Sequence, residues 1–189
     1  TEGWACGNNG MLLHSTNGGQ SWQNQTSGVG DKLRDIWFAS AMNGWAVGRN
    51  GILIYTANGG QTWAPQSSPA VNELRGIHML DVQRGWIVGS DGLILYTTNG
   101  GANWSTQLGV PNGNEEEFEA VYALDDNHVW AAGGQGRIYY TENGGQTWNQ
   151  QVSGTAVALM DIFFPTSSDG WVAGTSGFLG RWDSATQTW

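Results

Sequence analysis

The sequence has little cysteine, little proline and little positive charge. A single cysteine among 189 residues cannot form a disulfide within the chain, so cysteine content assigns no redox compartment. Seven lysines and arginines against sixteen acidic residues give a formal net charge of −9, which excludes the basic face that nucleic acid requires. No apolar run approaches the roughly 20 residues of a membrane helix. We therefore expect no nucleic-acid partner and no direct membrane insertion.

Glycine and tryptophan are abundant, with 30 and 12 residues, and they lie in a repeat. Residues 44–63 read GWAVGRNGILIYTANGGQTW, and four other stretches follow the same pattern. The repeats begin at about residues 3, 44, 85, 129 and 170, so their starts are 41, 41, 44 and 41 residues apart. A period of about 40–50 residues is typical of propellers and solenoids.

Each repeat divides into four short segments that have the composition of β-strands. Around the second repeat they are residues 33–38, 44–48, 52–56 and a segment that begins at residue 62. They are rich in β-branched and aromatic residues, and glycine, asparagine or serine bounds them. Four antiparallel strands, repeated radially, make the blade of a propeller. We predict an all-β fold, a β-propeller of four-stranded antiparallel blades, with residues 1–189 as a single domain.

The segments number 18 of the 20 that five complete blades would need. The first blade lacks its first strand, and the chain ends where the last strand of the fifth blade would begin. Two interpretations stay open: a five-bladed ring with a thin seam, or part of a six- to eight-bladed ring in a longer chain. We favour five visible blades in a processed product that is close to complete. The sequence starts without methionine or signal peptide, which is typical of a processed or excised chain.

Two turn signatures recur in the repeats. The second and third segments are joined by Gly-x-x-Gly, for example GRNG at 48–51, which fits a primed hairpin turn with positive φ angles. The third and fourth are joined by turns such as TANGGQTW at 56–63, in which an asparagine side chain can hydrogen-bond the backbone. We assign Asn17, Asn58, Asn99 and Asn143 a structural role in these turns. Ten of the 12 tryptophans share two repeat positions, and we expect them to pack between blades.

These turns resemble the Asp-box, or BNR, motif, with asparagine in the place of aspartate. The full pattern GWxxGxxGxIxxTxNGGxTW, preceded by LxxIxF, resembles the photosystem II stability/assembly factor family over nearly all of the chain. The resemblance implies a propeller in an extracytoplasmic compartment (thylakoid lumen, periplasm or cell surface) that binds a reaction-centre precursor. Similar repeats occur in surface proteins, sialidases and xyloglucanases. The family uses a basic patch on one face, whereas this chain is acidic overall.

The candidate binding residues lie on the first segment of each blade. One repeat position holds Trp37, His78, Tyr122 and Phe163, and the position three residues earlier holds Arg34, Arg75, Glu119 and Met160. Arg49 lies in a neighbouring turn. Aromatic side chains beside arginine suit a protein or sugar partner. The alternative is that the aromatic residues only pack between blades.

Catalytic and metal sites find less support in the sequence. The arginines do not supply the three guanidinium groups that a sialidase site needs. Asp35 and Asp161 share a repeat position, but we expect the blades to separate them widely, whereas a glycosidase needs two carboxyl groups about 5–10 Å apart. The acidic stretch 112–117 has no regular ligand spacing, and Cys6 aligns with small apolar residues of the core. We expect no cofactor and no metal.

The sequence therefore favours a non-enzymatic protein-binding or assembly scaffold. A carbohydrate-binding or glycosidase-related surface module is the first alternative, and a structural repeat of an extracellular adhesin is the second. The partner would be another protein or a glycan.

Overall fold

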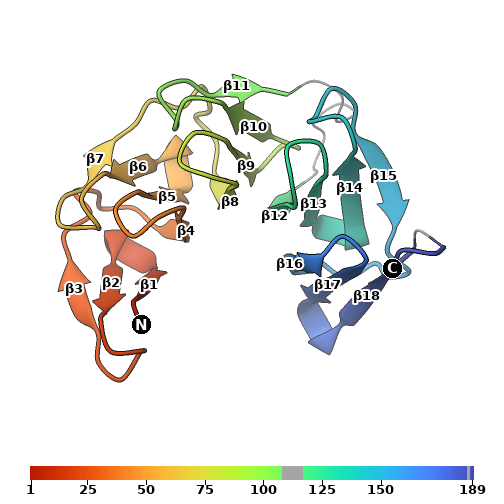
Figure 1. Ribbon diagram of the computed structural model, residues 1–189, viewed down its shortest axis with the longest axis horizontal. Helices are drawn as coiled ribbons and strands as arrows, with labels where there is room; N and C mark the ends of the chain where they lie inside the picture. The colour runs from red at the N-terminus through yellow and green to blue at the C-terminus, as the bar shows by residue number, and fades with distance from the viewer. Residues whose placement is uncertain (108–116, 187) are drawn as a thin grey trace.

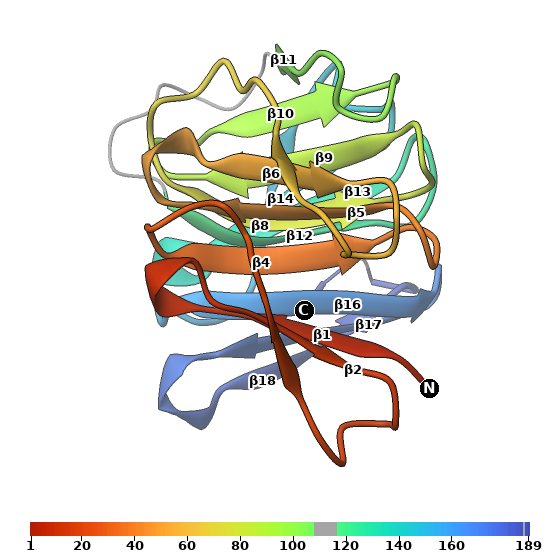
Figure 2. The same cartoon turned by 90° about the vertical axis from the view of Figure 1, so that its left-hand side faces the viewer.

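The computed structural model describes residues 1–107, 117–186 and 188–189. These residues form five antiparallel sheets that lie side by side along an arc, with the first and last sheets at its two ends (Figure 1). The five sheets are the predicted blades, and together they make a partial β-propeller. Turned by 90°, most strands run roughly horizontally across the molecule, and neighbouring strands of a blade point in opposite directions (Figure 2).

The first strand of each of blades two to five lies on the concave side of the arc (Figure 1). These inner strands are β4 (Leu33–Phe38), β8 (Leu74–Met79), β12 (Phe118–Ala123) and β16 (Leu159–Thr166). They are followed outward by β5 (Gly44–Gly48), β9 (Gly85–Gly89), β13 (Val129–Gly133) and β17 (Asp169–Gly174), and then by β6 (Leu53–Thr56), β10 (Ile94–Thr97), β14 (Arg137–Thr141) and β18 (Leu179–Asp183). The outermost are β7 (Ala64–Pro65), β11 (Ser105–Thr106) and β15 (Asn149–Val152).

The first and fifth blades have three strands each in the described residues, and the other three blades have four. The first blade consists of β1 (Gly3–Cys6), β2 (Leu12–Ser15) and β3 (Gln23–Gln25), and the fifth of β16, β17 and β18. This agrees with the strand inventory expected from the sequence. The predicted start of the fourth segment at Thr62 is wrong, because β7 begins only at Ala64, after the tryptophan that closes the turn.

The Gly-x-x-Gly turns adopt the predicted positive φ angles, but one residue later than expected. In the second blade the left-handed pair is Asn50 and Gly51, with φ of 56° and 68°, and Ile52 N donates to Arg49 O at 3.0 Å. The first glycine of the motif, Gly48, is instead extended. Asparagine, aspartate and glycine tolerate this region better than most residues, which explains their recurrence at the turn.

The Asn-Gly-Gly turns are held by their own side chains, as predicted. In the second blade Asn58 Oδ1 accepts a hydrogen bond from Thr62 N at 3.0 Å. The Thr56 hydroxyl donates to Asn58 Oδ1, and its oxygen accepts from Gly60 N at 2.9 Å. The same bonds recur around Asn17, Asn99 and Asn143. Because these side-chain oxygens satisfy backbone N–H groups, the asparagines are structural.

Tryptophan fills the junctions between blades. Trp45, Trp86 and Trp130 are at most 3% exposed, and each pairs across its sheet with a tyrosine. In the first blade His14 takes the place of that tyrosine and stacks on Trp4, with ring centroids 4.0 Å apart. Gly60 of the second blade lies so close that a methyl group there would overlap the Trp4 ring. The core of the molecule is thus a series of layers between blades, and Cys6 packs at the edge of the first layer.

Candidate functional site

Every inner strand contains a β-bulge at the same repeat position. In β4, Leu33 pairs with Gly48 and Asp35 with Val47, so Arg34 is the extra residue. The corresponding shifts in β8, β12 and β16 make Arg75, Glu119 and Met160 the extra residues. A bulge redirects a side chain away from the regular alternation of a strand. The sequence position that holds two arginines is therefore specialised in every blade.

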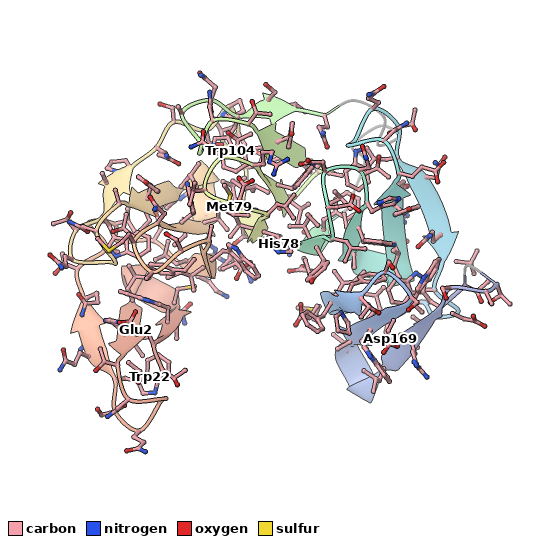
Figure 3. The ribbon with its side chains drawn as sticks, in the orientation of Figure 1. Glu2, Trp22, His78, Met79, Trp104 and Asp169 are labelled. Carbon is pink, nitrogen blue, oxygen red and sulfur yellow. The ribbon has the colours of Figure 1, made fainter. Side chains whose placement is uncertain are left out.

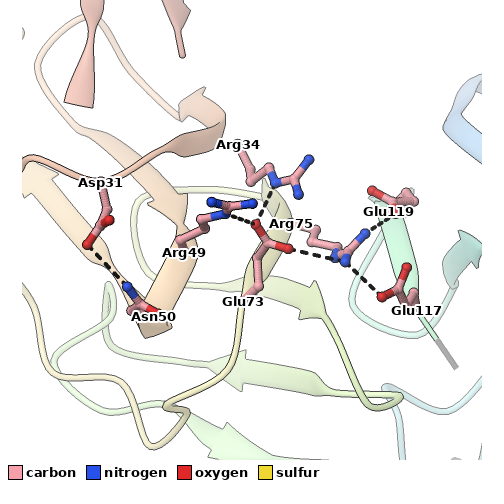
Figure 4. A network of polar contacts seen from close by, with 8 residues as sticks. All are labelled: Asp31, Arg34, Arg49, Asn50, Glu73, Arg75, Glu117 and Glu119. Carbon is pink, nitrogen blue, oxygen red and sulfur yellow. Dashed lines mark hydrogen bonds and ion pairs between the residues drawn. The ribbon is translucent and has the colours of Figure 1, made fainter. Parts of the chain in front are cut away.

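The bulged arginines form the arginine–glutamate network, which we define as Arg34, Arg49, Arg75, Glu73, Glu117 and Glu119 (Figure 4). Glu73 Oε1 accepts from Arg34 Nε at 2.8 Å and from Arg49 Nε at 3.3 Å, and Glu73 Oε2 lies 3.1 Å from Arg75 Nη2. Arg75 also pairs with Glu117 at 2.9 Å and with Glu119. The predicted binding arginines thus lie together, joined through glutamates.

Glu73 is the centre of this network, and its titration reflects that position. The hydrogen bond from Arg34 and the charges of Arg34 and Arg75 hold the pKa of Glu73 below its usual value, although partial burial works against them. The same bond raises the pKa of Arg34. Both groups are therefore ionised at neutral pH.

Two guanidinium groups keep unused donors at this site. Arg34 and Arg49 reach Glu73 through Nε, and their terminal nitrogens make no hydrogen bond or ion pair with any residue that the structure describes. The Arg49 side chain is 59% exposed and that of Arg34 is 24% exposed. Terminal nitrogens of a guanidinium are suited to bidentate binding of a carboxylate.

The aromatic row, Trp37, His78, Tyr122 and Phe163, runs along the inner strands with successive ring centroids 4.2, 4.5 and 5.4 Å apart. His78 lies on the concave side of the arc (Figure 3). Each of the first three rings makes a hydrogen bond to the next blade. Trp37 Nε1 donates to Met79 O at 2.9 Å, and Tyr122 Oη donates to Phe164 O at 2.6 Å. His78 Nδ1 accepts from Ala123 N at 2.7 Å. These three rings therefore pack between neighbouring blades and join them.

Burial differs along this row. His78 is 6% exposed, and burial lowers its pKa to about 4, so it is neutral at physiological pH. Trp37 and Tyr122 are half-buried, whereas Phe163 is 53% exposed. The buried and half-buried rings of the row therefore join neighbouring blades, whereas the ring of Phe163 is exposed to solvent.

Asp35 and Asp161 line one pocket, which corrects the expectation that the blades separate them widely. The pocket measures about 350 Å³ and is walled by all four inner strands. Burial raises the pKa of Asp35 to about 6; hydrogen bonds from the amides of Ile77 and Ile36 oppose this shift, and the charge of Asp161 adds to it. The curvature of the arc brings the second and fifth blades toward each other, and this curvature is not readable from one repeat.

Several expectations concern absences or residues without a described structure. Among the described residues, no group of three or more histidine, cysteine, aspartate or glutamate side chains is arranged to hold a metal ion. No helix in the described part of the chain has the length and apolar character to span a membrane. Of the acidic stretch 112–117, residues 112–116 lie outside the described residues, and Glu117 belongs to the network.

Sequence reasoning missed the glutamates of the network. Glu73 lies outside the strands, one residue before β8, and Glu117 holds the same repeat position before β12. Glu119 was aligned with the arginines but not recognised as their partner. The bulge position holds Arg34, Arg75 and then Glu119, and this change of charge sign between neighbouring blades was the signal that could have found the Arg75–Glu119 pair.

The chain was compared with known proteins. It resembles the structure of YCF48 from Cyanidioschyzon merolae, with 20% sequence identity, a TM-score of 0.74 and coverage of 96% of this chain. It also resembles the structure of YCF48 bound to a D1 peptide, with 26% identity, a TM-score of 0.69 and coverage of 83% of this chain. The chain spans 66% and 52%, respectively, of the lengths of those two structures. No curated protein sequence matches it.

A glycoside hydrolase of family GH74 from Niastella koreensis shares the fold, with 15% identity, a TM-score of 0.75, and coverage of 98% of this chain and 34% of that one. The model of the photosynthesis system II assembly factor YCF48 family matches residues 24–112 and 110–183, most of the chain. The chain therefore belongs to the photosynthesis system II assembly factor YCF48 family.

Proposed function

We propose that the chain is a non-enzymatic scaffold that binds an extended, carboxylate-bearing segment of a photosystem II protein. The observation that carries this proposal is the pair of guanidinium groups, Arg34 and Arg49, whose terminal nitrogens have no hydrogen-bond partner among the described residues. The structure of a family member with a D1 peptide supports a peptide as the ligand. We also propose an extracytoplasmic location for the chain, as its family resemblance implies.

The network orients the two arginines before a ligand arrives. Glu73 binds both through Nε, which fixes the plane of each guanidinium and leaves its terminal nitrogens for an incoming carboxylate. A charge-assisted hydrogen bond of this kind contributes about 1.5–3 kcal/mol. Because the rest of the chain is acidic, these groups would select the position at which a carboxylate can dock.

The glutamates also limit the affinity of this face. Three arginines and three glutamates balance in the network, so long-range attraction of an acidic peptide is weak. Specificity then depends on short-range, bidentate contacts rather than on net charge. Exposed ion pairs are screened by salt, and binding through Arg49 should weaken as ionic strength rises.

Fluorescence anisotropy with a labelled D1 peptide tests the proposal. The unaltered chain should bind the peptide, and Arg34→Ala and Arg49→Ala should each weaken binding by about tenfold, the loss of one charge-assisted contact. Arg181→Ala is the matched control, because it removes the same charge from the fifth blade, where Arg181 pairs with Asp169. Equal affinity for all four proteins, or no binding by the unaltered chain, would contradict the proposal.

The glycosidase and glycan alternatives have their own readouts. Both carboxylate oxygens of Asp35 accept backbone N–H groups, from Ile36 at 2.8 Å and Ile77 at 2.9 Å, which is the arrangement of a carboxylate that links blades. We expect no hydrolysis of xyloglucan and no glycan-array signal. A hydrolytic activity lost in Asp161→Asn, or a glycan signal lost in Phe163→Ala, would favour those alternatives over the scaffold.

A further inference from the structure

The pocket between Asp35 and Asp161 is a built cavity that the arginine–glutamate network does not use. It lies beside the bulges of the inner strands, and Asp35, Trp37, Ile77, Tyr122, Asp161 and Phe163 are among its walls. Aromatic rings and aliphatic side chains make up most of the lining, and two carboxylates are its charged groups. This combination is one that accommodates an organic cation.

The charge in this pocket is not balanced within the described structure. None of the lining residues is a lysine or arginine. Arg34 adjoins Asp35 in the sequence, but its Nε is bound to Glu73, and the bulge directs it to the network. The charge of Asp161, a second negative group, acts on Asp35.

We propose that this pocket binds the ammonium or guanidinium group of a lysine or arginine side chain presented by the bound peptide. The inference rests on the proposed peptide-binding function and adds a basic residue to the ligand. Asp161 carries the strongest acceptor for it: Oδ1 accepts from Ile162 N at 2.8 Å, while Oδ2 has no hydrogen-bond partner among the described residues. Asp35 uses its own Oδ2 to accept from Ile77 of the next blade.

The aromatic rings complete the site. Phe163, at 53% exposure, and the half-buried Trp37 and Tyr122 border the same space as the carboxylates. A cation over such ring faces gains about 0.5–1 kcal/mol at an exposed site. A volume of about 350 Å³ holds the long stem of lysine or arginine, whose methylene groups can pack on Ile77 and its neighbours.

The two sites together define a ligand with both signs of charge. A carboxylate would lie on Arg34 and Arg49, and a basic side chain would enter the pocket beside Asp35. Arg34 and Asp35 are consecutive on β4, so an extended segment crossing this strand can reach both. The partner is therefore a segment in which acidic and basic residues lie within a few positions of each other.

Nuclear magnetic resonance titration with a single amino-acid probe tests the pocket without the peptide. Nα-acetyl-lysine methylamide should cause saturable shifts of the Ile77 and Ile162 amides and of the Trp37 indole. The neutral analogue Nα-acetyl-norleucine methylamide should cause none at the same concentration. Asp161→Asn should weaken the lysine probe about threefold, and Phe163→Leu about twofold to fivefold.

Asp169→Asn is the matched control, because Asp169 is a carboxylate of the same blade that pairs with Arg181 outside the pocket. It should leave the affinity for the probe unchanged. Equal shifts from the lysine and norleucine probes, or an equal loss in the Asp161 and Asp169 variants, would overturn the proposal.

A peptide series separates this inference from the proposed function. In a D1 peptide that carries a lysine or arginine, replacing that residue by norleucine should weaken binding by at least the factor by which Asp161→Asn weakens binding of the unaltered peptide. If the peptide binds through Arg34 but ignores this replacement, the pocket is refuted and the scaffold function stands. If the lysine probe binds and the peptide does not, the pocket stands and the proposed function fails.

Discussion

The middle blades and the fifth blade are built from the same repeat, yet they differ in what covers them. Trp45, Trp86 and Trp130 are at most 3% exposed, whereas the equivalent Trp171 is 38% exposed. Leu179 is 65% exposed, and its counterparts Leu53, Ile94 and Ile138 are at most 2% exposed. We therefore expect equivalent side chains of the repeat to contribute differently to stability. The next blade, rather than the residue itself, determines the contribution.

The largest expected difference between these regions is in tryptophan truncation. Trp86→Ala should lower the free energy of unfolding by about 3–5 kcal/mol, because it leaves a cavity in a closed layer between blades. Trp171→Ala should cost less than about 1 kcal/mol, because solvent already reaches the ring. Urea unfolding of the two variants measures this, and equal losses would contradict the comparison.

His78, the buried member of the aromatic row, should make the stability of the chain depend on pH. The covered His78 has a pKa of about 4, below the ordinary value of 6.5, so the unfolded chain binds its proton more tightly. The contribution of neutral His78 to the free energy of unfolding is fully present above about pH 6.5. It falls by about 3 kcal/mol as the pH is lowered toward about 4. In His78→Gln the amide oxygen can still accept from Ala123 N, and this loss should vanish.

Urea unfolding of both proteins at pH 7 and pH 4.5 measures the His78 effect. The stability of His78→Gln relative to the unaltered chain should improve by about 2–3 kcal/mol between these values. Asp35 acts in the opposite direction, since its raised pKa of about 6 favours folding as the pH falls, but it is common to both proteins and cancels. If the difference in unfolding free energy between the two proteins did not change with pH, His78 would not be held neutral between its blades.

A smaller difference is expected between turns. Asn58→Ala should destabilise the chain by about 1–2 kcal/mol, because Thr62 N and Thr56 Oγ1 lose their acceptor. The corresponding turn of the fifth blade reads WDSATQTW and lacks the Asn-Gly-Gly signature. Ser184→Ala in that turn should change stability by less than about 0.5 kcal/mol. Thermal unfolding of the two variants tests whether the signature is what stabilises the turn.

The sequence predicted most of the fold because the information is local and repeated. Strand β4 has the bounds that its alternation suggests, and the positive φ angles follow from Asn-Gly, Asp-Gly and similar pairs. The tryptophan turn was misassigned by two residues, since Trp63 closes the turn before the ladder of β7 begins. Propensity alone does not separate a turn-covering tryptophan from a strand residue.

The candidate site was only partly predictable, for a different physical reason. Arg34, Arg75 and Arg49 were selected as candidate binding residues, and all three contact Glu73. The role of Glu73 depends on an irregular segment, and the meeting of Asp35 and Asp161 depends on the curvature of the whole arc. Such features come from several blades at once, and one repeat does not encode them.

Amide hydrogen exchange of the chain with and without bound D1 peptide tests most directly whether the peptide binds at the bulge positions of the inner strands rather than at the asparagine turns. We predict protection in β4 and β8 around Arg34 and Arg75, where bulges redirect the arginines, and no change in the turns of Asn17, Asn58, Asn99 and Asn143. Protection confined to those asparagine turns, with β4 and β8 unaffected, would contradict the account.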